Sequence, residues 1–266
     1  RILVSCCPDH TFLFLAQRIH NVFQNPFCKM DSDLFMRQFF EKESSTFTYL
    51  LADLDTLEAV IIDPVDVTSD RDIELINELR FQLKFSINTH VHADHITGSG
   101  ILKKKIKGSK SMLSGVSGGE ADVLLEHGDM ISFGKFNLKV LLTPGHTSGC
   151  ISLLLVDTDP QFVFTGDCLF IRGCGRTDFQ DGCSKTLYQS VHTQLFPLPE
   201  STIVYPAHDY KGRTCSTIGE EKRLNPRLTK SEPEFCAIMD NLNLTQPKKI
   251  NEAVPANMCC GFPFPD

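Results

Sequence analysis

The chain has 266 residues, of which 41% are hydrophobic and 22% charged, so it can bury a large hydrophobic core and long disordered segments are excluded. A net charge of −7 and an isoelectric point of about 5.7 argue against a nucleic-acid partner. No apolar run reaches the roughly 20 residues of a membrane-spanning helix, so we expect no membrane insertion. The one basic run, Lys103 to Lys107, is interpreted as the solvated face of a helix rather than a binding patch.

The first thirty residues carry Arg1, Arg18 and Lys29 against a single acid, Asp9. This composition fits the remains of an organelle transit sequence as well as a flexible N-terminal tail, and both interpretations stay open. We expect residues 31–266 to form one domain.

Eleven cysteines are spread over the chain in an odd number and without any CxxC spacing. In a chain with enough apolar residues for a core, this pattern favours free thiols in a reducing compartment over a disulfide framework.

Strand-like segments rich in β-branched and aromatic residues recur along the chain at 47–54, 58–65, 85–92, 136–143, 151–158, 162–169 and 201–208. Helical patterns, with apolar residues three and four apart, occupy 72–81, 95–106 and 184–196. After Tyr210 the chain becomes polar and irregular and offers one more helix, 232–242, preceded by a serine that can cap it. This order predicts an α+β fold in which packed sheets are covered by helices.

The segment THVHADH, residues 89–95, gathers three histidines and an aspartate at the end of an apolar run. On a regular strand the side chains of His90 and His92 would share one face, and a bend beyond the strand would bring Asp94 and His95 to the same space. A lone buried histidine is more often a core residue than a ligand, but four such groups together favour a metal site.

Three later strand-like runs each end on one ligand-type residue, namely His146, Asp167 and His208. A loop that follows a strand is held by the sheet and remains accessible, which suits a positioned polar group. Each of these sequences alone is also ordinary turn chemistry. Combined with residues 89–95, they predict one shared metal site.

The series HVHADH, TPGHT, TGD and PAH resembles the metallo-β-lactamase superfamily, which implies an αββα sandwich of two packed sheets with helices outside and metals at one edge. The longer motifs resemble the persulfide dioxygenase family, the mitochondrial sulfide-oxidation enzymes associated with ethylmalonic encephalopathy. These motifs are THVHADHITGSG (89–100), TGDCLFIRGCGRTDFQ (165–180), YPAHDYKG (205–212), LNPRLT (224–229) and VPANMCCG (254–261).

This resemblance implies a single iron(II) per chain held by His90, His146 and Asp167. Two histidines and one carboxylate on one face leave coordination positions open. The implied reaction converts glutathione persulfide, O2 and water into sulfite and glutathione. The remaining ligand-type residues are implied to orient ligands and to hydrogen-bond water or oxygen: His92, Asp94, His95 and His208. The residue types do not decide between iron and zinc, or between one metal ion and two.

Glutathione carries two carboxylates, so its site needs cations and hydroxyl donors. The resemblance suggests Tyr210 and Arg227 as substrate contacts. Arg176 is a further candidate, although we favour an internal ion pair between Arg176 and Asp178 that shapes the loop after Asp167. We assign no catalytic role to Cys260.

Two alternatives remain beside this interpretation. A glyoxalase II type binuclear hydrolase of glutathione thioesters would use the same ligand residues. Its relatives append a sizeable helical domain after the last histidine, for which this chain has few residues. A metal-free scaffold of the same fold is opposed by the complete set of ligand-type residues. We expect a mitochondrial matrix location, or otherwise a cytoplasmic one; a homodimer and the range of persulfide substrates stay open.

Overall fold

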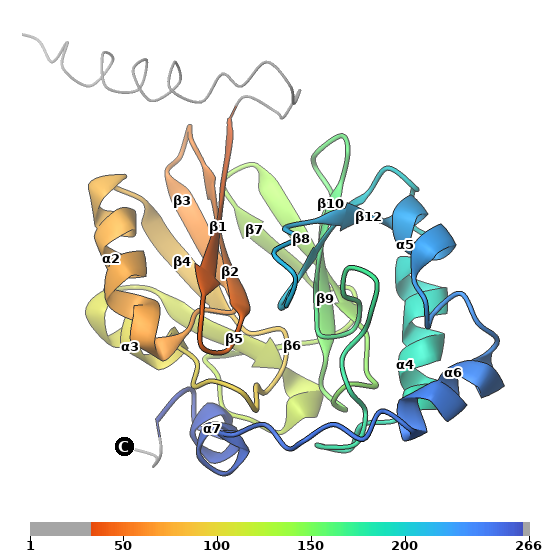
Figure 1. Cartoon of the computed structure of the whole chain (residues 1–266). Coiled ribbons are helices and arrows are strands. Elements are labelled where there is room, and N and C mark those ends of the chain that lie inside the picture. The colour runs from red at the N-terminus through yellow and green to blue at the C-terminus, as the bar shows by residue number, and fades with distance from the viewer. Residues whose placement is uncertain (1–32, 263–266) are drawn as a thin grey trace, which may run out of the picture.

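Two six-stranded sheets pack face to face, with helices on both outer faces (Figure 1). This arrangement is seen in a computed structural model, which describes residues 33–262. The side chains between the sheets form the main core and are largely aromatic and branched, among them Tyr49, Val60, Phe136 and Phe164. The fold is therefore the αββα sandwich expected from the sequence.

The first sheet is ordered along the chain from β1 to β6. Its strands are Leu34–Glu41 (β1), Thr46–Asp53 (β2), Glu58–Ile62 (β3), Gln82–Ile87 (β4), Lys110–Ser114 (β5) and Val123–Leu125 (β6). Helices α2 (Ser69–Glu78) and α3 (Ser99–Lys105) cover its outer face, where Ile76 and Leu102 pack against the apolar side chains of β2 and β3. Short 3-10 turns, η1 (Asp66–Thr68) and η2 (Gly115–Ser117), complete this half.

The second sheet has the order β12-β11-β10-β9-β8-β7. Its strands are Met130–Phe133 (β7), Phe136–Leu142 (β8), Ile151–Leu155 (β9), Phe162–Gly166 (β10), Ile203–Pro206 (β11) and Ser216–Thr217 (β12). Its outer face is covered by α4 (Ser184–Ser190), the π-helical turn η3 (Val191–Leu195), α5 (Ile218–Leu224) and α6 (Glu232–Asp240). Leu187, Phe235 and Leu228 form the core of this layer.

The last helix, α7 (Ile250–Met258), leaves both layers and lies below the first sheet, beside the connection between β4 and α3 (Figure 1). Strands β3, β4 and β5 run parallel to one another, and so do β10 and β11. Because parallel strands bring their carboxyl ends to the same edge, the loops that follow β4, β10 and β11 can meet there.

Several element predictions were wrong in their bounds. The strand expected at 85–92 ends at Ile87, and the helix expected at 95–106 begins at Ser99, so His90 and His92 lie on a loop and not on a strand. The helix expected at 184–196 is α-helical only to Ser190 and then widens into the π turn. In this loop the backbone N–H groups of Thr89 and Thr97 bond to the remote side chains of Asp63 and Asn257, and these bonds compete with strand pairing.

The segment after Tyr210 contains three helices, α5, α6 and α7, rather than the single helix expected. The predicted cap of α6 is confirmed, because Ser231 and Glu234 form a reciprocal capping box. The short strands β5, β6, β7 and β12 and the edge strand β1 were missed. Their lengths of two to eight residues give a weak periodic signal, and in β1 only the first two side chains are buried.

The expected transit or flexible segment, residues 1–30, lies outside the described residues. Within residues 33–262, no helix combines the length and the apolar character needed to span a bilayer. The cysteines of this range are free thiols, as expected: Cys150, Cys168, Cys174, Cys183, Cys215, Cys236, Cys259 and Cys260.

Candidate metal centre

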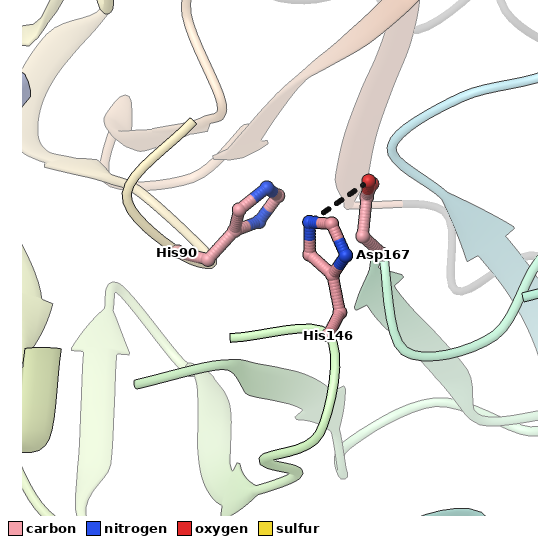
Figure 2. Close-up of side chains that lie close together, drawn as sticks. All are labelled: His90, His146 and Asp167. Atoms are coloured by element: carbon pink, nitrogen blue, oxygen red, sulfur yellow. Dashed lines mark ion pairs between the residues drawn. The ribbon is translucent and has the colours of Figure 1, made fainter. Parts of the chain in front are cut away.

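Three side chains from separate loops converge where the two sheets meet (Figure 2). His90 lies on the loop after β4, His146 on the loop between β8 and β9, and Asp167 follows β10 directly. One ligand-type atom from each lies within 4.8 Å of the others, and Nε2 of His146 is 3.4 Å from Oδ2 of Asp167. The structure thus brings together the three residues expected to hold iron.

Hydrogen bonds fix which nitrogen of His90 faces inward. Thr89 donates its hydroxyl hydrogen to Oδ2 of Asp63 at 2.9 Å, and Oγ1 of Thr89 lies 3.0 Å from Nδ1 of His90. Because the hydroxyl hydrogen is already used, Nδ1 of His90 donates to Thr89. Nε2 of His90 is therefore left with a lone pair for a metal.

The same logic applies to His146 and His208, whose Nδ1 atoms face backbone carbonyl groups. Nδ1 of His146 lies 2.6 Å from the carbonyl oxygen of Arg176, and Nδ1 of His208 lies 3.1 Å from that of Ser45. Since a carbonyl oxygen only accepts, each Nδ1 carries the hydrogen and each Nε2 is free.

A second group of ligand-type atoms lies beside the first. His92, Asp94 and His95 also offer atoms within 4.8 Å of one another, and the rings of His90 and His92 are 4.1 Å apart. His92 donates from Nε2 to Oδ1 of Asp63 at 3.1 Å, since that carboxylate only accepts. His208 is the fourth candidate for an orienting role, and its Nε2 lies 3.6 Å from Oδ2 of Asp94 and 3.5 Å from Oδ1 of Asp167.

The donor set fits a metal ion, because buried polar atoms point into the centre without hydrogen-bond partners. These atoms are Nδ1 of His92, Nε2 of His95 and Oδ1 of Asp167. A buried lone pair without a partner costs free energy unless a cation binds it. Imidazole nitrogens with one carboxylate are ligands typical of iron and zinc.

Burial and nearby charge set the protonation of this site. Burial lowers the pKa of His90 and of His92 well below the usual range, so both rings are neutral near pH 7, as metal ligands must be. Burial also lowers the pKa of His208, but the carboxylates of Asp167 and Asp94 outweigh it and the pKa is raised. Burial raises the pKa of Asp94, yet His95 and His208 outweigh burial and lower it well below its usual range.

The centre opens into a pocket of about 610 Å³. His146, Asp167 and His208 line its inner end, and the walls come from residues 170–176, 209–211 and 244–248. A pocket of this size suits a small organic ligand. The metal group is therefore reachable by a substrate, unlike a closed structural metal site.

The candidate substrate contacts differ in how free they are. Arg176 is held by Asp178 at 2.6 Å and donates to the carbonyl oxygens of Leu244 and Thr245, so the expected internal ion pair is present. Arg227 lines the pocket, lies 3.8 Å from Sδ of Met239 and also contacts the thiol of Cys174. Its guanidinium has no ion-pair partner in the part of the chain that the structure describes.

Tyr210 lines the pocket and is 72% exposed. Its ring stacks on that of His208, with centroids 6.0 Å apart and planes 9° apart. The hydroxyl is therefore accessible to a ligand in the pocket, while the ring is held next to the metal centre.

The sequence interpretation missed two residues that hold the site, Asp63 and Asn257. Asp63 follows β3 in the segment EAVIIDPV, and an aspartate just after a buried strand is the same signal that indicated Asp167. Asn257 lies in the motif VPANMCCG, but no local pattern relates it to residues 160 positions earlier.

The family model of the metallo-beta-lactamase superfamily matches residues 42–208. The chain is 55% identical to the mitochondrial persulfide dioxygenase ETHE1 of Homo sapiens, over 87% of this chain and 91% of that protein. The crystal structure of ETHE1 from Myxococcus xanthus superposes with a TM-score of 0.81 at 52% identity, covering 85% of this chain and 99% of the other.

A more distant relative is the hydroxyacylglutathione hydrolase of Brucella canis, which is 32% identical over 84% of this chain and 83% of that protein. The chain is clearly more similar to the persulfide dioxygenase, at 55% identity, than to the hydroxyacylglutathione hydrolase, at 32%. The chain thus belongs to the metallo-beta-lactamase superfamily and, within it, to the persulfide dioxygenases.

Proposed function

We propose that the protein is an iron-dependent dioxygenase of sulfide catabolism that converts glutathione persulfide, O2 and water into sulfite and glutathione. The observation that carries this proposal is the triad of His90, His146 and Asp167, in which His146 and Asp167 line an open pocket. The name of the human relative, a persulfide dioxygenase, supports the same reaction.

His90, His146 and Asp167 would hold one iron(II) per chain through the nitrogen and oxygen atoms that face the centre. Iron(II), when bound, supplies open coordination positions and the redox chemistry that O2 requires. Thr89 and the carbonyl of Arg176 keep the two histidine rings in the tautomer that ligation needs. Neutral His92 and charged Asp94, with His95 and His208, provide acceptors and donors for water and substrate around it.

The pocket suits the charge of glutathione. Arg227 offers a guanidinium without an acidic partner among the described residues, and paired N–H groups match a carboxylate. Tyr210 adds a hydroxyl near His208. A carboxylate held by Arg227 would orient the persulfide end of the substrate toward Asp167 and His146, at the inner end of the pocket.

A binuclear hydrolase of glutathione thioesters is the second candidate. Nδ1 of His92 and Nε2 of His95 are buried without partners, so a second ion has donors beside the first. The hydroxyacylglutathione hydrolase of Brucella canis shows that this activity occurs among relatives at 32% identity. A metal-free scaffold would leave Oδ1 of Asp167, a ligand atom of the proposed triad, buried and uncompensated, which argues against it.

The mitochondrial matrix is the proposed location, supported by the name of the human relative, which is described as mitochondrial. A homodimer is retained as a hypothesis that a sedimentation measurement would test. The single domain proposed for residues 31–266 would be tested by one cooperative unfolding transition.

The test pairs metal analysis with oxygen uptake on glutathione persulfide. The wild type should contain about one iron per chain and consume O2 when the persulfide is added. Asp167→Ala should lose iron and oxygen uptake together, because it removes the only carboxylate of the triad. Asp94→Ala is the matched control, since it removes a carboxylate of the second group and should keep the iron.

Full turnover with stoichiometric iron in Asp167→Ala would refute the ligand assignment. Two zinc ions per chain, no oxygen uptake and cleavage of a glutathione thioester would establish the binuclear hydrolase instead. In that case Asp94→Ala would lose one of the two metals.

A further inference from the structure

A buried asparagine near the C-terminus holds the backbone of the metal-binding loop. Asn257, on α7, is 4% exposed and donates from its amide nitrogen to the carbonyl oxygens of His92 and His95, each at 2.8 Å. Its amide oxygen accepts from the backbone N–H of Thr97, also at 2.8 Å. We propose that Asn257 is a positioning residue that fixes this loop in its metal-binding conformation.

The three bonds constrain a segment that contains most of the second ligand group. Between the carbonyl of His92 and the N–H of Thr97 lie Asp94 and His95. With both ends of this segment tied to one rigid amide, the side chains between them have few alternative positions. Asn257 thus acts on the metal centre through the backbone and touches no metal ligand atom itself.

The turn that follows α7 also packs closely against the same loop. Gly261 has a φ of 87°, and a β-carbon built on it would overlap the carbonyl oxygen of Thr97. Likewise, a β-carbon built on Gly100, in the first turn of α3, would overlap the carbonyl oxygen of Cys260. The backbones are therefore in direct contact, so the position of Asn257 is set by α7 and not by its own flexibility.

A second buried side chain holds the loop from the opposite direction. Asp63 accepts from the backbone N–H of Thr89 at 2.7 Å and from Nε2 of His92 at 3.1 Å. His90 lies between these two contacts. Asp63 therefore fixes the start of the loop and Asn257 its end, and the proposed iron ligand His90 depends on both.

This inference rests on the metal site proposed above and predicts a loss of metal affinity. Groups that orient ligands from outside the coordination sphere typically change affinity by about 10- to 100-fold when removed. Asn257→Ala should weaken metal binding by this amount. Asn257→Asp keeps an acceptor for Thr97 but loses both donated bonds, so it should weaken binding at least as much. Asn257→Ser provides a smaller polar alternative if these variants fold poorly.

The experiment titrates Co(II) into the apoprotein and records its visible absorption together with the dissociation constant. Asn225→Ala is the matched control. Asn225 is fully buried, accepts from the N–H groups of Arg227 and Leu228, and donates to the carbonyl oxygen of Gly173, away from the metal loop. It should lower thermal stability but leave the cobalt affinity and spectrum unchanged.

A normal Co(II) affinity and spectrum in the folded Asn257 variants would overturn the proposal, since Asn257 would then only stabilise the fold, as Asn225 does. Gly261→Ala gives an independent check, because it displaces α7 from Thr97 without altering the amide and should also weaken cobalt binding. The iron content and oxygen uptake of the wild type test the proposed function separately. Failure there leaves the ratio of variant to wild-type cobalt affinity interpretable.

Discussion

Four histidine rings of the site, His90, His92, His146 and His208, depend on an acceptor from a remote part of the chain. Asp63 serves His92 directly and His90 through Thr89, while the carbonyls of Arg176 and Ser45 serve His146 and His208. The types and spacing of these candidate ligands could be predicted, because histidine and aspartate stand out after apolar runs. The two backbone carbonyls could not, since they carry no side-chain signal, whereas Asp63 follows a buried strand as Asp167 does.

Arg227 provides a prediction at the scale of one residue. Arg227→Met should raise KM for glutathione persulfide about 10- to 100-fold with the iron content unchanged, because it removes a charge-assisted bond to a carboxylate. Steady-state oxygen uptake measures the effect. Arg223→Met is the control, as this arginine is paired with Glu200 on the surface at 2.9 Å. An unchanged KM in Arg227→Met would show that Arg227 does not bind the substrate.

Elements determine which loops can meet, and the approximate positions of the longer strands were the most predictable part of the fold. Apolar runs located β4, β8, β10 and β11 within a few residues, and with them the loops that carry His90, His146, Asp167 and His208. The end of β4 was predicted too late because the apolar pattern continues to Val91, which is buried although it lies on a loop. Helices α5 and α7 were missed because Gly219 and Pro255 interrupt their patterns.

Asp122 connects three neighbouring elements and gives a prediction at this scale. It lies just before β6 and accepts hydrogen bonds from the backbone N–H and the hydroxyl of Ser111 on β5 and from Lys103 on α3. Burial opposes its ionisation, but the bonds from Lys103 and Ser111 outweigh burial and lower its pKa. Asp122→Asn should therefore reduce the free energy of unfolding at pH 7, by about 1 kcal/mol.

The pH dependence follows from the sign of this shift. A carboxyl whose pKa is lower in the folded state contributes stability above its unfolded pKa, and the contribution is lost as the pH falls through the folded value. The difference between wild type and Asp122→Asn should be constant from about pH 5 to 8 and shrink below about pH 4. Urea unfolding of the apoproteins measures it. Asp70→Asn, which removes an exposed pair with Lys105, should change little.

At the scale of the whole molecule, an acidic chain carries a cationic pocket. Lys211, Arg227 and Lys248 line the pocket without ion-pair partners in the described range 33–262, although the chain has a net charge of −7. An anionic substrate is repelled by the average surface and attracted by this opening. Nothing in the local sequence could have predicted this, because the three cations come from three segments that meet only in the fold.

Salt dependence tests this opening. The double variant Lys211→Gln and Lys248→Gln should lower kcat/KM for glutathione persulfide roughly 3- to 10-fold at low ionic strength. The difference should disappear near about 0.5 M salt, where charges are screened within a few ångströms. The control, Lys107→Gln with Lys110→Gln, removes the same charge outside the pocket. Equal losses in both double variants would attribute the effect to net charge alone.

The unpartnered lone pairs at the metal centre also connect the protein to its supply of metal. An ion that binds only the folded chain adds stability by mass action, about 4 kcal/mol at a thousandfold excess over its dissociation constant. A chain made while the metal is scarce would keep Oδ1 of Asp167 buried without compensation. It would unfold more often and be degraded sooner. The cellular level of the protein, and not only its activity, would then follow the nutritional state of the cell.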